Sequence, residues 1–114
     1  MSTTREQTIA SFFAAMNTGD ADAAAALVDP DVEIAIGSQA FVGRDAVRQL
    51  AVQRDAELGF ETIPVTIDAD ADGVAVVARR VQRWRQSGEI ASDEEVRARF
   101  SVASDGLIKS VRLS

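Results

Sequence analysis

The stretch FFAAMNTGDADAAAALVDPDVEIAIG, residues 12–37, decides the fold, because it predicts two helices and a strand in quick succession. Its first helix begins before the stretch. Ile9, Phe12, Phe13 and Met16 follow the spacing i, i+3, i+4, i+7, which gives one apolar stripe on a helix. The N-terminal helix is therefore expected to pack this stripe into the core.

Polar residues and glycine mark where these helices begin and end. Two pairs have capping-box spacing at the start of the first helix, Thr3 with Glu6 and Thr4 with Gln7. Gly19 suits the left-handed position after a helix, and Asp20 suits the N-cap of the next one. The alanine-rich segment that follows therefore predicts a second, short helix.

Proline and the alternation of apolar and polar side chains predict where the second helix ends and where the first strand lies. Asp29-Pro30 is expected to end the second helix, since the residue before proline is pushed out of the helical region. Residues 32–36 alternate and are rich in β-branched side chains, which predicts a strand. After a loop at residues 37–43, a third helix is predicted from Arg44, with Leu58 on its buried face and Gly59 as its end.

The remaining sequence predicts β-structure. Pro64 marks the first of these strands as an edge strand or a bulged one. Asp68, Asp70 and Asp72 form a short acidic run that is expected to lie in a hairpin turn. The run is not expected to bind calcium, because the glutamate that completes an EF-hand calcium loop is missing. The expected strands are residues 60–67, 74–86, 94–103 and 107–113. Helices followed by an antiparallel sheet indicate the α+β class.

Composition excludes several kinds of chemistry. The 114 residues suit one domain and contain no cysteine, histidine or tyrosine, which removes Ser-His-Asp and Cys-His mechanisms. The net charge of −6 argues against nucleic-acid binding, although residues 79–114 carry 8 basic and 5 acidic side chains. No apolar run is long enough for a membrane span, and the start has no signal-peptide pattern, so we expect a cytoplasmic protein.

Three stretches carry a family resemblance: residues 12–37, FVGRDAVRQL at 41–50 and VRARFSVASDGLIKSVRL at 96–113. Together they resemble the SnoaL-like proteins of the nuclear transport factor 2-like superfamily, which includes polyketide cyclases, ketosteroid isomerases and limonene epoxide hydrolases. The resemblance implies one SnoaL-like domain over residues 1–114. Its expected fold is a cone-shaped α+β barrel, with three N-terminal helices packed on a strongly curved, mainly antiparallel sheet. It also implies a pocket inside the cone and a homodimer through the outer sheet face, and the alanine- and arginine-rich composition points to a bacterial source.

The family's catalytic residues do not carry over to this sequence. Phe12, Ile34 and Ala98 stand where ketosteroid isomerases have their tyrosine and two aspartates. Glu33 would face the pocket only after a one-residue slip that exposes three apolar neighbours. The Arg-x-Asp pair of the epoxide hydrolases is also missing, so the resemblance identifies no catalytic residue.

The segment ARRVQRWRQ, residues 78–86, holds four arginines. Alternation divides its strand into two faces. The face with the tryptophan carries fewer charges and is expected to point inward, with Arg80 and Gln82 at the pocket mouth, where they would fix an acidic or carbonyl-bearing ligand. The arginines expected on the outer face are Arg79, Arg83, Arg85, Arg97 and Arg99. Glu94 and Glu95 are expected where cross-strand pairing with Arg79–Arg83 is possible.

These patterns predict a protein that binds a small hydrophobic molecule without a metal or other cofactor. The expected ligand-binding residues are Phe12, Met16, Ile34, Ile36, Phe41, Arg80, Gln82, Trp84, Ala98 and Phe100. Two alternatives stay open. One is an isomerase, cyclase or hydrolase that uses Arg80, Gln82 or Glu33, and the other is a structural or assembly module whose pocket is filled by its own side chains.

Overall fold

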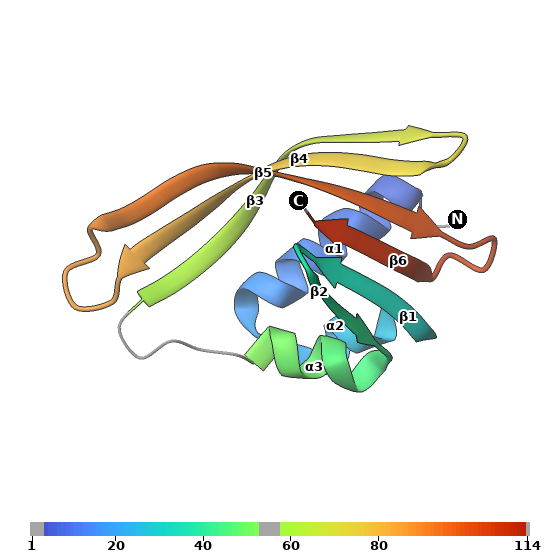
Figure 1. Cartoon of the computed structure of the whole chain (residues 1–114), viewed down its shortest axis with the longest axis horizontal. Helices are drawn as coiled ribbons and strands as arrows, with labels where there is room; N and C mark the ends of the chain where they lie inside the picture. Colours follow the sequence, from blue (N-terminus) through green and yellow to red (C-terminus); the bar gives the residue numbers. More distant parts are fainter. Residues whose placement is uncertain (1–3, 53–57, 114) are drawn as a thin grey trace.

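The fold is seen in a computed structural model that describes residues 4–52 and 58–113. Two helices come first, a third helix follows the second strand, and the remaining strands follow in sequence (Figure 1). The helices are α1 (Arg5–Thr18), α2 (Ala21–Ala26) and α3 (Arg44–Val52). The strands are β1 (Val28–Ile36), β2 (Gln39–Val42), β3 (Leu58–Asp70), β4 (Gly73–Trp84), β5 (Ile90–Val102) and β6 (Ile108–Leu113).

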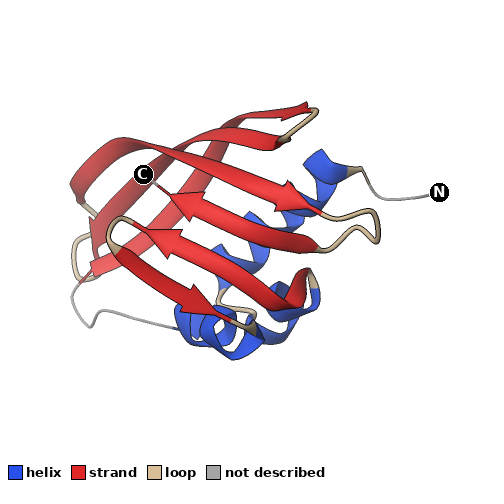
Figure 2. Ribbon diagram, turned by 45° about the vertical axis from the view of Figure 1, so that its right-hand side comes forward, coloured by secondary structure: helices blue, strands red, loops and turns tan. Residues whose placement is uncertain are grey.

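The strands form one curved sheet in the order β2-β1-β6-β5-β4-β3. All neighbouring strands are antiparallel except β1 and β6. The helices gather on one face of this sheet, and the long strands β3, β4 and β5 extend beyond them (Figures 1 and 2). The α+β prediction, with helices on a curved and mainly antiparallel sheet, is confirmed.

Local capping explains where the first two helices lie. The Thr4 hydroxyl accepts a hydrogen bond from the Gln7 amide, and the Thr4 amide donates to the Gln7 side chain, so the capping box is present. Gly19 has a φ of 74°, a left-handed conformation that glycine adopts without strain. The Asp20 carboxylate accepts a hydrogen bond from the amide of Ala23 at the start of α2.

The structure corrects the boundaries around β1. Helix α2 ends before Leu27, and Asp29-Pro30 lies inside β1 instead of ending the helix. The pairing of β1 with β6 shifts register between Val28 and Glu33, so the proline falls where the ladder is already irregular. Residues 37–43, expected to be a loop, contain strand β2, whose four residues pair with β1.

Further corrections concern the β3–β5 region. Leu58 and Gly59 belong to β3, where they pair with Trp84 and Arg83, so they do not end the third helix. The predicted course of that helix through residues 53–57 lies outside the described residues. Strand β5 begins at Ile90, four residues before its predicted start. The expectation for Pro64 is confirmed, since β3 is an edge strand and its register shifts at Pro64.

The core lies between α1 and the middle of the sheet. Phe12 and Phe13 from α1 both meet Phe100 of β5 edge to face, with ring centroids 6.0 and 5.7 Å apart. Buried residues of α3 and β1, among them Val47 and Val32, extend this cluster. The apolar stripe predicted for the first helix therefore anchors the sheet, and the core occupies only part of the sheet's inner face.

Candidate functional site

Strand β4 carries the predicted site residues from the core to the open end of the sheet. Val74, Val76 and Ala78 are buried on the face toward the helices. Arg80 and Gln82 share that face by alternation but are only half-buried, and Trp84 at the end of the strand is 43% exposed. The open end of the inner face is therefore the candidate site.

Arg80 is the most unusual side chain of this open end. Its guanidinium lies over the ring of Phe60 from β3, with the guanidinium carbon 5.1 Å from the ring centroid. Its Nε atom is buried and has no hydrogen-bond partner in the described part of the chain. The guanidinium is thus held by an aromatic ring and lacks an acceptor for a buried N–H.

A second polar group lies next to Arg80 on the same face. The Ser92 hydroxyl of β5 donates a hydrogen bond of 2.9 Å to Oε1 of Gln82. Both residues are half-buried, and they are partners in the β4–β5 register. Since the oxygen of Gln82 is already used, its NH2 group is the part of this amide that can donate to a ligand.

Asn17 ties the end of α1 to the edge of the sheet at this site. Its Nδ2 donates to the carbonyl oxygen of Thr62 at 2.8 Å, and its Oδ1 accepts from the amide of Thr62 at 2.9 Å. Thr62 is the β3 partner of Arg80. Asn17 thus satisfies the backbone N–H and C=O groups of one residue on the edge strand β3. It also holds the end of α1 against the strand that neighbours Arg80.

The other residues predicted to bind ligand are distributed between core and site. Phe12, Ile34, Ala98 and Phe100 are buried in the core cluster. Met16, Ile36 and Phe41 are half-buried against that cluster. The structure therefore brings Arg80, Gln82 and Trp84 together at the open end and places the four buried residues deeper, where they pack on one another.

Sequence reasoning missed three residues of the open end. The sequence predicts a strand at Phe60, a loop at Ser92 and a helix end at Asn17, and it assigns none of them to the site. The first two are cross-strand partners of Gln82, so their role depends on a register that appears only when strands pair. The signal available for Asn17 was its place in NTGD, since a helix end is where a short amide can reach a neighbouring strand.

The outer face of β4 and β5 holds most of the remaining arginines, as expected. Glu95 is the cross-strand partner of Arg79, also as expected, but the ion pair of Arg79 is formed with Asp93. Arg79 is paired with Asp93 at 2.8 Å, and this hydrogen bond raises the pKa of Arg79 above its ordinary value. Arg97 lies 3.6 Å from Glu95 on its own strand.

Arg85 lies beyond the end of β4, yet its side chain lies next to Gly59, on the outer face that Gly59 shares with Arg83, as predicted. One prediction for this outer face is wrong. Glu94 pairs with Arg80 in the register and shares its inner face, because Glu94 and Glu95 are neighbours and must point to opposite sides.

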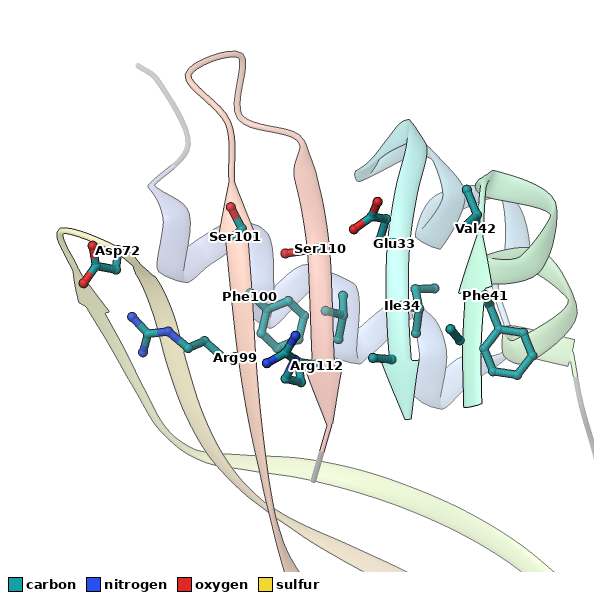
Figure 3. A pocket seen from close by; sticks show the side chains of 13 residues that line it. Glu33, Ile34, Phe41, Val42, Asp72, Arg99, Phe100, Ser101, Ser110 and Arg112 are labelled. Carbon is teal, nitrogen blue, oxygen red and sulfur yellow. The ribbon is translucent and has the colours of Figure 1, made fainter. Parts of the chain in front are cut away.

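The outer face also carries an open groove of about 480 Å³ (Figure 3). Glu33 and Val42 lie on one side of it, and Asp72 and Arg99 on the other. Glu33 is exposed here and faces away from the helices, so the slip that would turn it into the cone does not occur. The predicted residues Ile34, Phe41 and Phe100 contribute to the groove's lining, while Arg80, Gln82 and Trp84 do not.

The charged groups of the groove are of both signs. Arg99 donates to both carboxylate oxygens of Asp70, at 2.8 and 3.0 Å. This hydrogen bond is the main reason why the pKa of Asp70 lies below its ordinary value. The described residues place no group of three or more histidine, cysteine, aspartate or glutamate side chains where they could hold a metal ion. The groove is a mixed polar surface without a buried unpaired group.

Comparison with known families gives a clear match. Residues 9–111 match the model of the SnoaL-like domain, which covers most of the chain. The sequence matches none of the proteins whose functions have been curated. In the described residues, no helix is both long enough and apolar enough to cross a membrane.

Several solved structures share this fold. A nuclear transport factor 2-like protein of Burkholderia xenovorans superposes with a TM-score of 0.76 at 22% identity, covering 100% of this chain and 91% of that one. An epoxide hydrolase of Mycobacterium tuberculosis gives 0.78 at 21% identity, covering 96% and 76%. A second M. tuberculosis protein, solved in complex with estradiol-17beta-hemisuccinate, gives 0.72 at 17% identity, covering 93% and 88%. At these identities the likeness concerns the fold alone.

Proposed function

Because the chain belongs to the SnoaL-like domain family, we propose that it binds a small hydrophobic molecule at the open end of its cone. The observation that carries the proposal is the exposure of two aromatic side chains on the inner face, Phe60 at 39% and Trp84 at 43%. Apolar surface left open on a concave face beside a few polar groups is the usual character of a small-molecule site.

The surroundings of these rings favour a ligand with one polar group. Arg80 and Gln82 offer N–H donors between the aromatic rings and the core. Asn17 holds α1 against β3, so one wall of the site is fixed before a ligand arrives. A preformed wall lowers the entropic cost of binding.

The solved structures support this class of ligand by analogy only. One protein of the same fold was crystallised with estradiol-17beta-hemisuccinate, and another is a designed binder of 17-OHP. A curved sheet of this size can therefore enclose a molecule of several rings. We propose the same size class for this chain, without assigning it a steroid.

Binding is favoured over catalysis by the residues at the family's catalytic positions. Phe12, Ile34 and Ala98 have no group that accepts or donates a proton, and all three are buried. Glu33 lies on the outer face. Apart from the exposed carboxylate of Glu94, the described polar groups at the open end are a cation, an amide and a hydroxyl, which orient a ligand and do not abstract a proton at neutral pH.

We also propose that the outer face of the sheet joins two copies of the chain. Val42 of β2 and Ile63 of β3 are exposed apolar side chains on that face, at its two edges. Sedimentation of the purified protein at low and high salt tests this. We expect a dimer, and a monomer at about 100 μM, well above the Kd of typical stable dimers, would contradict it.

The test of the binding proposal is a titration with N-phenyl-1-naphthylamine, a neutral apolar dye that fluoresces when it leaves water. We expect saturable binding of one dye per chain and energy transfer from Trp84, the only tryptophan. Trp84→Ala should weaken dye binding about tenfold. Val42→Ala, an exposed apolar residue on the opposite face, is the matched control and should leave it unchanged. A pocket filled by its own side chains would give no saturable signal.

A further inference from the structure

Arg80 differs from Arg79 and Arg99 because no carboxylate of the described residues is paired with it, and its Nε atom is both buried and without a partner. Arg79 is paired with Asp93 and Arg99 with Asp70, both at 2.8 Å. Arg80 is half-buried, its Nε atom is inaccessible to water, and no hydrogen bond to Nε is found among the described residues. A cation removed from water without a partner is unfavourable, so its retention calls for a role.

The ring of Phe60 compensates for only part of this cost. It contacts the guanidinium from one side, at 5.1 Å, and attracts it through the negative face of the aromatic system. A ring cannot accept the directed N–H bonds of a guanidinium edge. The edge of Arg80 therefore remains available to an acceptor that approaches from the open end.

The carboxylates that the structure describes near Arg80 are either on the opposite face of the sheet or exposed to water. Asp93 faces the opposite side of the sheet, where it binds Arg79. Glu61 and Glu95 are exposed and by alternation share the face of Arg79. Glu94 is the cross-strand partner of Arg80, yet it is exposed, and the described structure has no ion pair between the two. Residues 4–52 and 58–113 therefore supply no counter-ion to Arg80.

We propose that the ligand of this site is a lipophilic carboxylic acid, whose carboxylate binds Arg80 while its apolar body lies on Phe60 and Trp84. This inference rests on the proposed function and adds the chemical class of the ligand. The guanidinium edge matches the two oxygens of a carboxylate, and the NH2 group of Gln82 can donate to the same head group. A single cation balances the single charge of a carboxylate, whereas a neutral carbonyl would leave it unbalanced.

The test compares two ligands that differ only at the head group. Decanoate and 1-decanol are used to displace N-phenyl-1-naphthylamine from the wild type at neutral pH, below the aggregation limit of both. We expect decanoate to bind at least about tenfold more tightly than decanol, as a charge-assisted hydrogen bond implies. Arg80→Met should abolish that preference without weakening decanol, and Arg80→Lys should keep part of it.

Arg79→Met is the matched control, since it removes the neighbouring charge from the opposite face of the same strand. It should leave the decanoate preference unchanged. Equal affinity for decanoate and decanol in the wild type would overturn the inference while leaving the proposed function intact.

Decanoate binding is also followed directly, through the NMR resonance of the Arg80 Nε–H, so that the dye is not required. We expect this resonance to move on saturation, because its buried hydrogen gains an acceptor or a changed environment. A resonance that stays in place at high decanoate concentration would overturn the inference even if the dye failed to bind. Failure of the dye alone would count against the proposed function and not against Arg80.

Discussion

The two halves of strand β4 follow the same alternation of side chains, but they differ in burial. Val74, Val76 and Ala78 on its first half are buried under the helices. Arg80 and Trp84 on its second half continue the same face, where the helices no longer cover the sheet (Figure 1). Alternation therefore decides which face a side chain takes, whereas the reach of the helices decides whether that face becomes core or site.

The largest expected difference between the halves is in stability. Phe100→Ala should lower the free energy of unfolding by about 3–5 kcal/mol, because it leaves a cavity among Phe12 and Phe13. Trp84→Ala removes a larger ring from the open half and should cost less than about 1 kcal/mol. Urea unfolding of both variants measures the contrast. Equal losses would mean that the open half is packed as tightly as the core.

The two hydrogen bonds between Asn17 of α1 and Thr62 of β3 should have the next largest effect on the free energy of unfolding. Asn17→Ala removes both hydrogen bonds to the Thr62 backbone and should cost about 1–3 kcal/mol, also measured by urea unfolding. Asn17→Asp keeps an acceptor for the Thr62 amide but loses the donor to its carbonyl, so an intermediate loss is expected. If Asn17→Ala were neutral, the end of α1 would be held by packing alone.

Adjacent arginines on β4 should respond in opposite directions. Arg79→Met removes an ion pair with Asp93 and should cost about 0.2–1 kcal/mol. Arg80→Met removes a half-buried cation that has only an aromatic ring beside it. Its free energy of unfolding should stay unchanged or rise, by no more than about 1 kcal/mol. A clear loss of stability in Arg80→Met would show that this arginine serves the fold and not a ligand.

The smallest effect concerns acid stability on the outer face. The hydrogen bond from Arg99 lowers the pKa of Asp70 below its ordinary value of 3.8 in the folded protein. The stabilisation is therefore present above that ordinary pKa and is lost as the pH falls through the folded-state pKa. Urea unfolding of wild type and Asp70→Asn, from about pH 6 down to about pH 2, should show the two stabilities converging at the acid end. If the two stabilities ran parallel over this pH range, the hydrogen bond from Arg99 to Asp70 would not contribute measurably to stability.

Much of the fold could be predicted from the sequence because its signals are local. The stripe from Ile9 to Met16, the capping of Thr4 and the left-handed Gly19 each act within a few residues. The wrong predictions concern segments whose structure depends on pairing with another strand. Strand β2 has four residues and exists only by pairing with β1, and Gly59 looks like a helix end until its pairing with Arg83 is known.

For the site, the sequence predicted which face of β4 carries it, but not the surroundings of that face. Alternation put Arg80, Gln82 and Trp84 on one side, where the structure has them. The same rule, applied from Phe100 back along β5, would have put Glu94 on the inner face, so that error was avoidable. The reach of the helices, the contact of Phe60 with Arg80 and the lack of a described partner for the Arg80 Nε depend on packing between distant segments, which no local pattern contains.

We propose that the open end of the cone, and not the outer groove, receives the small molecule. Amide chemical-shift mapping during a titration with N-phenyl-1-naphthylamine tests it most directly. We predict saturable shifts at Thr62, Gln82 and Ser92, which lie on the inner face around Arg80. Ser101, Ser110 and Arg112, which line the groove in Figure 3, should stay in place. Shifts confined to these three groove residues would contradict the account.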